Sequence, residues 1–514
     1  MKPVRVNLII LSLLTGGLLL IGLFLLLNGS IPSASADAGI LFVEKNGDGT
    51  TCNQVDPCAL QTGLAQALDG DTIYVEQGVY TSTGTSVITL TKSITLAGGW
   101  DGTTTIPIVH DPDLYPTTLD GERERRVVTI SGDITPTLDG FIITHGNATG
   151  LYAYCPTTPD GCGGGIAVFN AHPRITNNTI TNNIAAATTS GTSLRTTGYG
   201  GGLFLVGARR AIISSNEIIS NAASTAKHGY GGGLYLYGIS DGLRIQFNQV
   251  LSNSATTEID FSGEGGGIAG GPDEVLIWGN TFQGNRASSG SGGYGAAVYQ
   301  STGSATYLGN LIRGNGVTSA VYLEHSRSRF EGNRLEDNLS WVGIHLVNGP
   351  PGGGGPTFIN NVVIRSGSGL RIRGWKTVPL TVKLLHNTLV GSATGYGVYV
   401  EYYVTLFMTN TIVSNYTWGV TDTYPTSSTV LVDHTLFWVN NHDGIRGTHP
   451  VDGNPAFYSD SYHLGPGSAA LDVGINAGVF TDIDGDPRPI GAGYDIGADE
   501  RRIYVFLALV MIKH

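Results

Sequence analysis

Short apolar runs bracketed by asparagine recur along the middle of the chain. The run ITNNTITNN (175–183) returns as ISSNEIISN (213–221) and IQFNQVLSN (245–253), and weaker copies extend to LFMTNTIVSN (406–415). The shared core is N-x-φ-φ-x-N, where φ is apolar, and successive copies start 23 to 38 residues apart. A basic period of 23 residues, lengthened by insertions, is typical of a β-solenoid coil and not of a helical repeat.

Each coil of such a solenoid holds about three short strands, and stacked coils pair as parallel strands about 4.8 Å apart around a continuous core. Asparagine suits the turn between two strands, because it tolerates the left-handed conformation and hydrogen-bonds nearby backbone. Asparagines stacked from coil to coil can also form an amide ladder. The sequence therefore predicts a structural ladder formed by Asn178, Asn216, Asn248, Asn280, Asn310, Asn333, Asn361, Asn387 and Asn410.

Glycine-rich corners followed by alternating strands recur in the same phase. Examples are TGYGGGLFLVGA (197–208) and HGYGGGLYLYG (228–238). Because side chains alternate along a strand, the first apolar residue after each corner should point into the core and the next one outward. Flat aromatic rings on an outward face suit sugar rings, although packing between neighbouring coils explains them equally well. The outward carbohydrate-binding candidates are Phe204, Tyr235, Tyr237, Tyr299, Tyr322 and Tyr399.

Insertions precede four of these corners and are expected to form a wall beside the outward face. They span 186–199, 222–230, 254–264 and 286–294. Tyr199, Tyr230 and Tyr294 hold equivalent places in three of the insertions, and Glu264 holds that place in the fourth. The three tyrosines therefore join the candidates for carbohydrate binding.

Five charged or titratable residues, on four successive coils of the same face, are the candidates for catalysis. By the strand register, neighbouring members of this cluster lie about 5 Å apart. Ion pairs between coils are the alternative interpretation. The two glutamates, three coils apart, would lie about 14 Å from each other, too far for the carboxylate pair of a glycosidase. The cluster consists of Glu324, His345, Arg371, Arg373 and Glu401.

Over roughly residues 40–440 the sequence resembles right-handed parallel β-helix proteins, the fold of pectate lyases and many surface proteins. The resemblance implies an all-β solenoid of about ten to thirteen coils, closed at its N-terminal end by a short helix near 59–68. In the lyases of this fold, the strand face and its flanking loops form the substrate cleft, and clustered aspartates bind Ca²⁺. This face lacks such aspartates, so the resemblance implies the fold and no particular activity.

The C-terminal part resembles the choice-of-anchor Q domain, which closes many bacterial surface β-helix proteins. The resemblance rests on NPAFYSDSYHLGPGSAALDVGINAG (454–478) and DIDGDPRPIGAGYDIGADE (482–500). The family's Gly-Ser-Pro-Ala is Gly467-Ser468-Ala469-Ala470 here. Asp482, Asp484 and Asp486 are weak Ca²⁺ candidates, because the spacing resembles the start of an EF-hand loop, but an Asx-stabilised turn is the favoured interpretation. No other cofactor is expected, and no histidine pair has metal-ligand spacing.

The N-terminus predicts export. Lys2 and Arg5 precede an apolar run, and Ala34-Ser35-Ala36 fits a cleavage site, so residues 1–36 are expected to form a signal peptide or, alternatively, a signal anchor. Two short-range pairs of cysteines, Cys52 with Cys58 and Cys155 with Cys162, predict disulfides formed in an oxidising compartment. Both features favour an extracellular or cell-surface location.

Five segments follow from these features. They are a signal segment (1–36), an N-terminal cap with the first coils (37–125), the β-helix (126–440), the choice-of-anchor Q-like region (441–500) and a short apolar tail (501–514). The tail is too short to span a membrane as a helix.

Charge and composition narrow the function. The net charge is −12 and no basic stripe is present, which argues against nucleic acid as a partner. Contacts with the cell envelope are expected through the N-terminal segment or the tail. The favoured function is a non-catalytic, adhesin-like or carbohydrate-binding structural module, and the alternative is a polysaccharide lyase or glycoside hydrolase acting on the outward face. A purely structural envelope protein is a third possibility.

Overall fold

The computed structural model describes residues 38–151, 155–156, 160–188, 196–239, 241–290, 292–316 and 318–502. The expected signal segment (1–36) and most of the apolar tail (503–514) lie outside these residues. Over the part of the chain that is described, no helix is both long and apolar enough to cross a bilayer.

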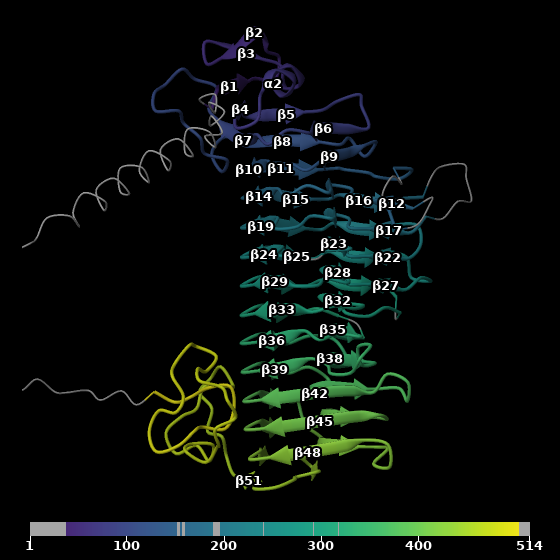
Figure 1. The fold of residues 1–514 in the computed structure, drawn as a ribbon, viewed down its shortest axis with the longest axis vertical. Coiled ribbons are helices and arrows are strands. Elements are labelled where there is room, and N and C mark those ends of the chain that lie inside the picture. Colours follow the sequence, from purple (N-terminus) through teal and green to yellow (C-terminus); the bar gives the residue numbers. More distant parts are fainter. Residues whose placement is uncertain are drawn as a thin grey trace, which may run out of the picture.

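The chain coils into a parallel β-helix, as the repeat predicts. Figure 1 shows the coils stacked along the long axis, with the N-terminal coil at one end and the final residues (yellow) folded back beside the lower coils. Three long sheets run along the stack, and each coil contributes one strand in turn to the first, second and third sheet. The third sheet has 13 strands among the described residues, which agrees with the expected number of coils.

The first sheet has 16 strands. In spatial order they are β2 (Asp48–Asn53), β3 (Asp56–Cys58), β1 (Ile40–Val43), β4 (Thr72–Glu76), β7 (Thr95–Trp100), β10 (Thr137–Asp139), β14 (Arg174–Thr176), β19 (Ile212–Ser214), β24 (Arg244–Gln246), β29 (Val275–Trp278), β33 (Ala305–Leu308), β36 (Arg329–Glu331), β39 (Thr357–Ile359), β42 (Leu380–Leu385), β45 (Val404–Thr409) and β48 (Thr429–Asp433).

The second sheet has 14 strands. They are β5 (Gly78–Tyr80), β8 (Thr117–Asp120), β11 (Phe141–Thr144), β15 (Thr179–Thr181), β20 (Glu217–Ile219), β25 (Gln249–Leu251), β30 (Thr281–Gln283), β34 (Leu311–Arg313), β37 (Arg334–Glu336), β40 (Val362–Ile364), β43 (Thr388–Val390), β46 (Ile412–Ser414), β49 (Leu436–Trp438) and β51 (Val451–Asp452).

The third sheet carries the glycine corners and the candidate face. Its strands are β6 (Ser86–Leu90), β9 (Arg126–Ser131), β13 (Ile166–Phe169), β18 (Leu203–Val206), β23 (Leu234–Tyr237), β28 (Ile268–Gly270), β32 (Val298–Gln300), β35 (Ser319–Glu324), β38 (Val342–Val347), β41 (Leu370–Arg373), β44 (Tyr396–Val400), β47 (Trp418–Asp422) and β50 (His442–Gly444).

The insertions add two further parallel sheets of four strands each between the second and third sheets. One contains β16 (Ile184–Ala186), β21 (Ala222–Ser224), β26 (Ser254–Thr256) and β31 (Arg286–Ser288). The other contains β12 (Gly161–Cys162), β17 (Gly198–Tyr199), β22 (Gly229–Tyr230) and β27 (Gly263–Glu264).

A short helix closes the N-terminal end of the core, close to the expected 59–68. Helix α2 (Leu60–Gln66) buries Leu60 and Gly63 against the first coils. The disulfide between Cys52 and Cys58 joins the strands beside it, as predicted. The Lys92 ammonium donates hydrogen bonds to the carbonyls of Leu64, Ala65 and Ala67 and so satisfies the end of the helix.

The glycine corners are required by backbone geometry. Gly231 has φ +67°, and a Cβ atom there would lie 2.0 Å from the carbonyl oxygen of Leu234. At Gly232 the Cβ would lie 2.4 Å from the backbone of Ser254 in the next coil. These glycines therefore allow both a left-handed turn and close contact between coils.

Eight of the nine expected asparagines form one continuous ladder between the first and second sheets. The side-chain oxygen of each, from Asn216 to Asn387, accepts hydrogen bonds from the backbone N–H and the side-chain amide of the asparagine one coil earlier, at 2.9–3.1 Å. The eight residues are almost fully buried. A second ladder, at the other end of the second sheet, contains Asn183, Asn221, Asn253, Asn285, Asn315 and Asn338.

Asn410 does not occupy the ladder position. Thr388 pairs with Ile412, so Thr411 is the residue aligned with Asn387, and Asn410 sits one position earlier with φ +50°. That left-handed position also suits asparagine, which explains the shifted match in the sequence. The Asn410 amide instead donates to the carbonyl of Ile475, and its oxygen accepts the Ile475 N–H.

The C-terminal region, residues 454–502, packs on the outside of the second sheet. The outward residue in β20 and β25 is polar and exposed (Glu217, Gln249), whereas the aligned residue in β40 and β46 is apolar and buried (Val362, Ile412). The covering side chains from the C-terminal region include Tyr462, Leu464, Ala470, Ile496 and Ala498. The change from polar to apolar therefore marks where the C-terminal region docks.

Candidate functional site

The outward face of the third sheet has the register expected from the glycine corners. Its central column aligns Ala167, Phe204, Tyr235, Ala269, Tyr299, Tyr322, His345, Arg371 and Tyr399 on successive coils. A second column, from the insertions, aligns Cys162, Tyr199, Tyr230, Glu264 and Tyr294 beside it. The two columns together define the candidate face.

The upper part of this face, nearer the N-terminus, is closed, which favours packing between coils, the alternative to carbohydrate binding, for its aromatic rings. Phe204 is 0% exposed and Tyr199 is 8% exposed, and both belong to a small apolar cluster outside the main core. Tyr235 stacks on Phe204 at 6.0 Å and meets Tyr199 edge-on at 5.0 Å. Tyr199 and Tyr230 stack at 5.1 Å. These rings pack against one another because the insertions fold over them, so Phe204 offers no surface to a ligand.

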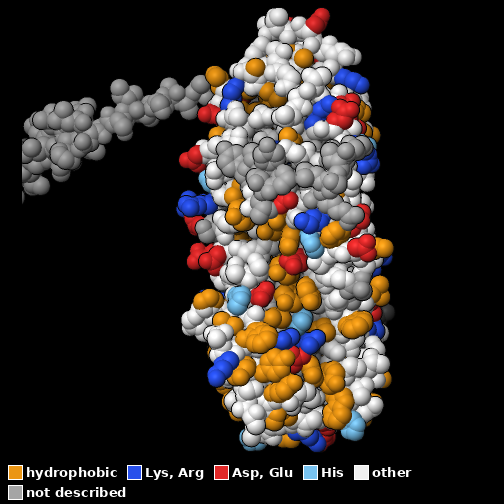
Figure 2. All heavy atoms as spheres, turned by 90° about the vertical axis from the view of Figure 1, so that its right-hand side faces the viewer, with side chains coloured by type: hydrophobic (Ala, Val, Ile, Leu, Met, Phe, Trp, Pro, Cys, Tyr) orange, Lys and Arg blue, Asp and Glu red, His pale blue; other side chains and the backbone are white. Residues whose placement is uncertain are grey.

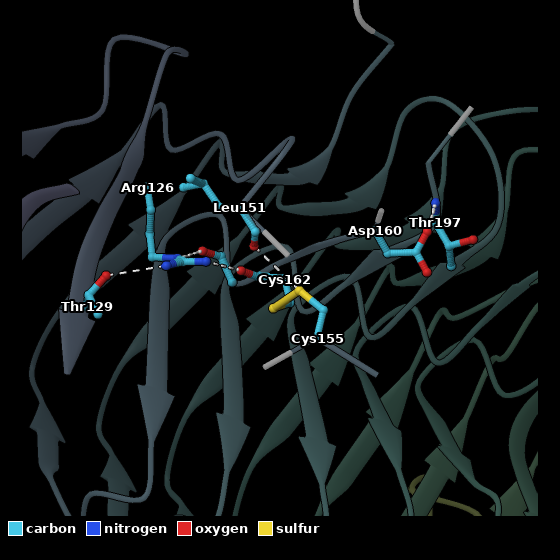
Figure 3. Close-up of a disulfide and its surroundings, with 8 residues drawn as sticks. Arg126, Thr129, Leu151, Cys155, Asp160, Cys162 and Thr197 are labelled. Carbon is cyan, nitrogen blue, oxygen red and sulfur yellow. Dashed lines mark hydrogen bonds between the residues drawn. A yellow bond between two sulfur atoms is a disulfide. The ribbon is translucent and has the colours of Figure 1, made fainter. Parts of the chain in front are cut away.

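The predicted disulfide between Cys155 and Cys162 belongs to the same cluster (Figure 3). Arg126, which is buried, donates to the carbonyls of Cys162 and Gly163 at 2.8 and 2.9 Å. Burial, followed by the charge of Glu264, raises the pKa of Tyr230 to about 12. The upper part of the face is thus an accessory core, and of its candidates only Tyr237, 42% exposed, is open to solvent.

We expect Tyr235→Ala to lower the melting temperature without changing any glycan affinity. The substitution removes a ring that contacts three other aromatic residues, and large-to-small changes of buried aromatics cost about 3–5 kcal/mol when the site is fully buried, with less here because Tyr235 is only partly buried. Thermal melting and glycan titration of the variant check this. An unchanged melting temperature with weakened glycan binding would instead make Tyr235 a ligand contact.

One coil further toward the C-terminus than Tyr230, Glu264 takes the place of a tyrosine in the second column. Its carboxylate accepts a hydrogen bond from the Tyr299 hydroxyl, across the small side chain of Ala269. Burial raises the pKa of Glu264, and burial together with the neighbouring carboxylates of Glu264 and Glu324 raises that of Tyr299. Both shifts favour the protonated forms, and the hydrogen bond joins the two side chains.

Tyr322 and His345 continue the central column. The Tyr322 ring stacks on Tyr299 at 5.4 Å and meets the His345 ring edge-on at 5.1 Å. Tyr294, 42% exposed, lies 4.7 Å from Tyr322 and forms the outer surface here. Burial, then the charges of Arg371 and Arg373, lowers the pKa of His345 to about 3, so the imidazole is neutral at physiological pH.

We expect acid to destabilise the protein partly through His345. The unfolded chain takes up this proton near pH 6.5, whereas the folded protein does so only near 3, so stability falls as the pH drops through 6.5. Melting temperatures of the wild type and His345→Gln at pH 7.5 and 5.0 test this. The loss between the two pH values should be smaller in the variant, and equal losses would contradict the assignment.

Three of the five charged candidates meet on the two coils that follow His345, where Arg371 and Arg373 both contact Glu401. Arg371 donates through Nε and Nη2 to Oε1 of Glu401 at 2.9 and 2.5 Å, and Nε of Arg373 lies 3.6 Å from Oε2. The Glu401 side chain is 5% exposed, while those of Arg371 and Arg373 are 39% and 31% exposed. The carboxylate is therefore hydrogen-bonded to Arg371 and ion-paired with Arg373, and both arginine side chains are partly exposed. Glu324 lies apart, accepting from the Asn348 amide at 3.1 Å.

Aromatic residues flank this group on both edges of the sheet. After the strands, Trp375, Tyr402 and Tyr424 follow one another on successive coils, with ring centroids 6.1 and 4.5 Å apart. The guanidinium of Arg373 lies 4.9 Å from the Trp375 ring and 5.2 Å from the Tyr402 ring. At the start of the strands, Tyr396 aligns with Trp418, and the ring of Tyr396 lies 4.6 Å from that of Tyr399.

Several of the aromatic rings that flank Arg371, Arg373 and Glu401 are exposed to solvent, unlike the packed rings of Tyr199 and Phe204. Trp375 is 47%, Tyr424 48% and Trp418 37% exposed. Figure 2 shows this side of the molecule, with hydrophobic and aromatic side chains gathered in its lower part around a few basic and acidic ones. We call the residues Arg371, Arg373, Trp375, Tyr399, Glu401, Tyr402, Trp418 and Tyr424 the lower face. The sequence indicated only Arg371, Arg373, Tyr399 and Glu401. Trp375, Tyr402 and Tyr424 lie in turns outside the repeat, and Trp418 is the first residue of β47, ahead of the alternating positions that the repeat marks.

The three Ca²⁺ candidates take different partners. Asp482 is buried, and its two oxygens accept the backbone N–H groups of Asp484, Asp486 and Glu500. Asp484 faces His463 at 2.7 Å, and Asp486 pairs with Arg502. The Asx-type turn expected from the sequence is formed by Asp482.

Comparison with known proteins supports the fold. Residues 224–389 match the family model described as right-handed β-helix region. A search of curated proteins finds no significant match. Among solved structures, pectate lyase Pel9A is 12% identical, with a TM-score of 0.36, 91% of this chain covered and 97% of that one.

Two further solved structures are similar at the same low level. The alginate lyase from Paenibacillus sp. str. FPU-7 is 12% identical, with a TM-score of 0.33, 67% of this chain covered and 93% of that one. The catalytic unit of the GH87 α-1,3-glucanase from Streptomyces thermodiastaticus strain HF3-3 is 13% identical, with a TM-score of 0.26, 79% of this chain covered and 69% of that one. At such low scores, no residue role, activity or substrate is transferred from these proteins.

Proposed function

We propose that this chain is an exported β-helix protein that binds a polysaccharide on the lower face without cleaving it. The observation that carries the proposal is the set of exposed aromatic rings flanking the Arg371–Glu401–Arg373 group. Aromatic faces pack against the apolar C–H faces of sugars, and tyrosine and arginine add hydrogen bonds to hydroxyl or carboxylate groups. The rings are held by the rigid sheet and its short turns, so little ordering is required on binding.

A binding role fits the lower face better than a catalytic one. Glu401 is buried beneath two arginines, and Glu264 is hydrogen-bonded to Tyr299. Glycoside hydrolysis requires two carboxylates on either side of one bond, and neither of these is free to serve. His345 is neutral but largely covered by Tyr322 and the arginines, and its low pKa makes it a weak base.

Export is part of the proposal. Two disulfides in a chain with no free cysteine among the described residues fit an oxidising compartment. The charged and apolar N-terminal run and the resemblance of residues 454–500 to the choice-of-anchor Q domain support a place at the cell surface. The docked C-terminal region would then hold the stack near the envelope.

Two assays on the purified protein test the proposal together. A glycan array should reveal binding to one class of polysaccharide. Incubation of the same polysaccharide with the protein, with and without Ca²⁺, should give neither ultraviolet-absorbing unsaturated ends nor new reducing ends. Product formation would overturn the non-catalytic role in favour of a lyase or hydrolase, and the absence of binding to any glycan would overturn the binding role.

A further inference from the structure

Three side chains of the C-terminal region meet at one point, although they come from separate turns. The ring of His463 and the carboxylates of Asp484 and Asp499 place their ligand atoms within 4.8 Å of one another. Ligands about 2.0–2.2 Å from a common ion are separated by distances in this range. Among the described residues, the C-terminal region docks on the β-helix through apolar side chains and through hydrogen bonds with Asn360, Thr388 and Asn410, and not through these three groups.

The imidazole of His463 is oriented by a fourth residue. Its Nδ1 is hydrogen-bonded to the Asp460 carboxylate, which also accepts the backbone N–H of His463. This leaves Nε2 directed at Asp484, 2.7 Å away. A carboxylate behind the histidine is the usual arrangement when the other ring nitrogen binds a metal, because it fixes the ring and strengthens the ligand.

Asp499 is the buried member of the group. The residue is 6% exposed, and one of its carboxylate oxygens accepts the Leu464 N–H at 2.7 Å. The other oxygen accepts no hydrogen bond from the described residues. A buried carboxylate with an unused oxygen is stabilised by a cation nearby.

A pocket of about 630 Å³ opens in front of the three groups. Its lining includes Asp460 and Asp486 besides His463, Asp484 and Asp499, so four aspartates face it together with Arg501 and Arg502. The excess of carboxylates favours a cation, and the pocket gives room for the water molecules that complete the coordination of an ion with three protein ligands.

We infer that His463, Asp484 and Asp499 bind a divalent transition-metal ion, with Asp460 as the residue that positions His463. One imidazole and two carboxylates suit Zn²⁺ and its neighbours better than Ca²⁺, which prefers oxygen ligands alone. The ion links residue 499 to the turns that contain residues 463 and 484, and so cross-links three segments of the C-terminal region. The inference is independent of glycan binding on the lower face.

Titration of the chelator-treated protein with ZnCl₂, followed by isothermal calorimetry, tests the site. The wild type should bind one Zn²⁺ per chain at this site, and Co²⁺ in its place should give visible absorption bands. His463→Gln and Asp484→Asn should each weaken binding at least tenfold, and Asp460→Asn should weaken it about 10–100-fold. Asp484 is exposed, so its variant is not expected to disturb folding, and thermal melts in chelator verify this.

A second group of potential ligands provides the matched control. Asp433, His434 and His449 also lie within 4.8 Å of one another, but the carboxylate of this group is only partly buried. His449→Gln should leave Zn²⁺ binding unchanged. The inference is overturned if the wild type fails to bind Zn²⁺, if binding survives His463→Gln, or if only His449→Gln removes it. In the first case, His463 is a protonated counter-ion for the aspartates.

Discussion

Arg488→Met is expected to undock the C-terminal region from the β-helix. Arg488 is 0% exposed in its side chain, and its Nη1 pairs with Glu500, equally buried, at 2.8 Å. Its Nη2 donates to the carbonyls of Gly497 and Ala498 at 2.9 and 2.8 Å. Removing one partner of a buried ion pair leaves an uncompensated charge and costs about 3–5 kcal/mol.

Limited proteolysis and hydrogen exchange of residues 454–502 measure this effect. The variant should be cleaved and exchange faster in this region while the coils above it stay protected. Arg365→Met is the matched control, because Arg365 and Asp337 form an exposed pair whose loss costs about 0–1 kcal/mol. Equal behaviour of the two variants would contradict a structural role of Arg488.

Asn280→Ala is expected to destabilise the centre of the stack by about 3 kcal/mol. The Asn280 oxygen accepts the buried backbone N–H of Asn248 and its side-chain amide, and the Asn280 amide donates to Ile245 and Asn310. Alanine removes all four hydrogen bonds and leaves the Asn248 N–H without an acceptor. Unsatisfied buried donors cost more than the bond itself contributes.

Native-state hydrogen exchange over residues 245–285 is the suitable measurement, because repeat arrays need not unfold in one step. Gln283→Ala, on the exposed side of β30, controls for the substitution itself and should have little effect. If the two variants exchange alike, the ladder contributes no local stability.

The sequence was sufficient to predict the coil and the register of the third sheet. Both depend on local patterns, namely the asparagine turn, the glycine corner and the alternation of side chains, which recur with every coil. Asn410 was misplaced by one residue, because both positions of the turn accept asparagine. The pairing along the central column followed correctly from the inward residues, since one face of each strand must be buried.

Which part of the face is open could not be predicted in the same way. Phe204 and Tyr399 occupy the same column, yet one is buried by the folded insertions and the other lies below them. Trp375 and Tyr402 lie in turns, where the alternation of inward and outward side chains does not apply and gives no prediction. His463, Asp484 and Asp499 are separated by 21 and 15 residues, and only the fold of the C-terminal region brings them together.

The most direct test of the proposed binding face compares two exposed tryptophans. Trp375 belongs to the lower face, whereas Trp278 stacks on Phe247 at 4.6 Å on the first sheet and is similarly exposed, at 39% against 47%. Calorimetric titration with a glycan retained on the array should give an affinity at least tenfold weaker for Trp375→Ala, a loss of about 1.4 kcal/mol, and an unchanged affinity for Trp278→Ala. Equal affinities of Trp375→Ala and the wild type, with both proteins folded, would contradict carbohydrate binding on the lower face.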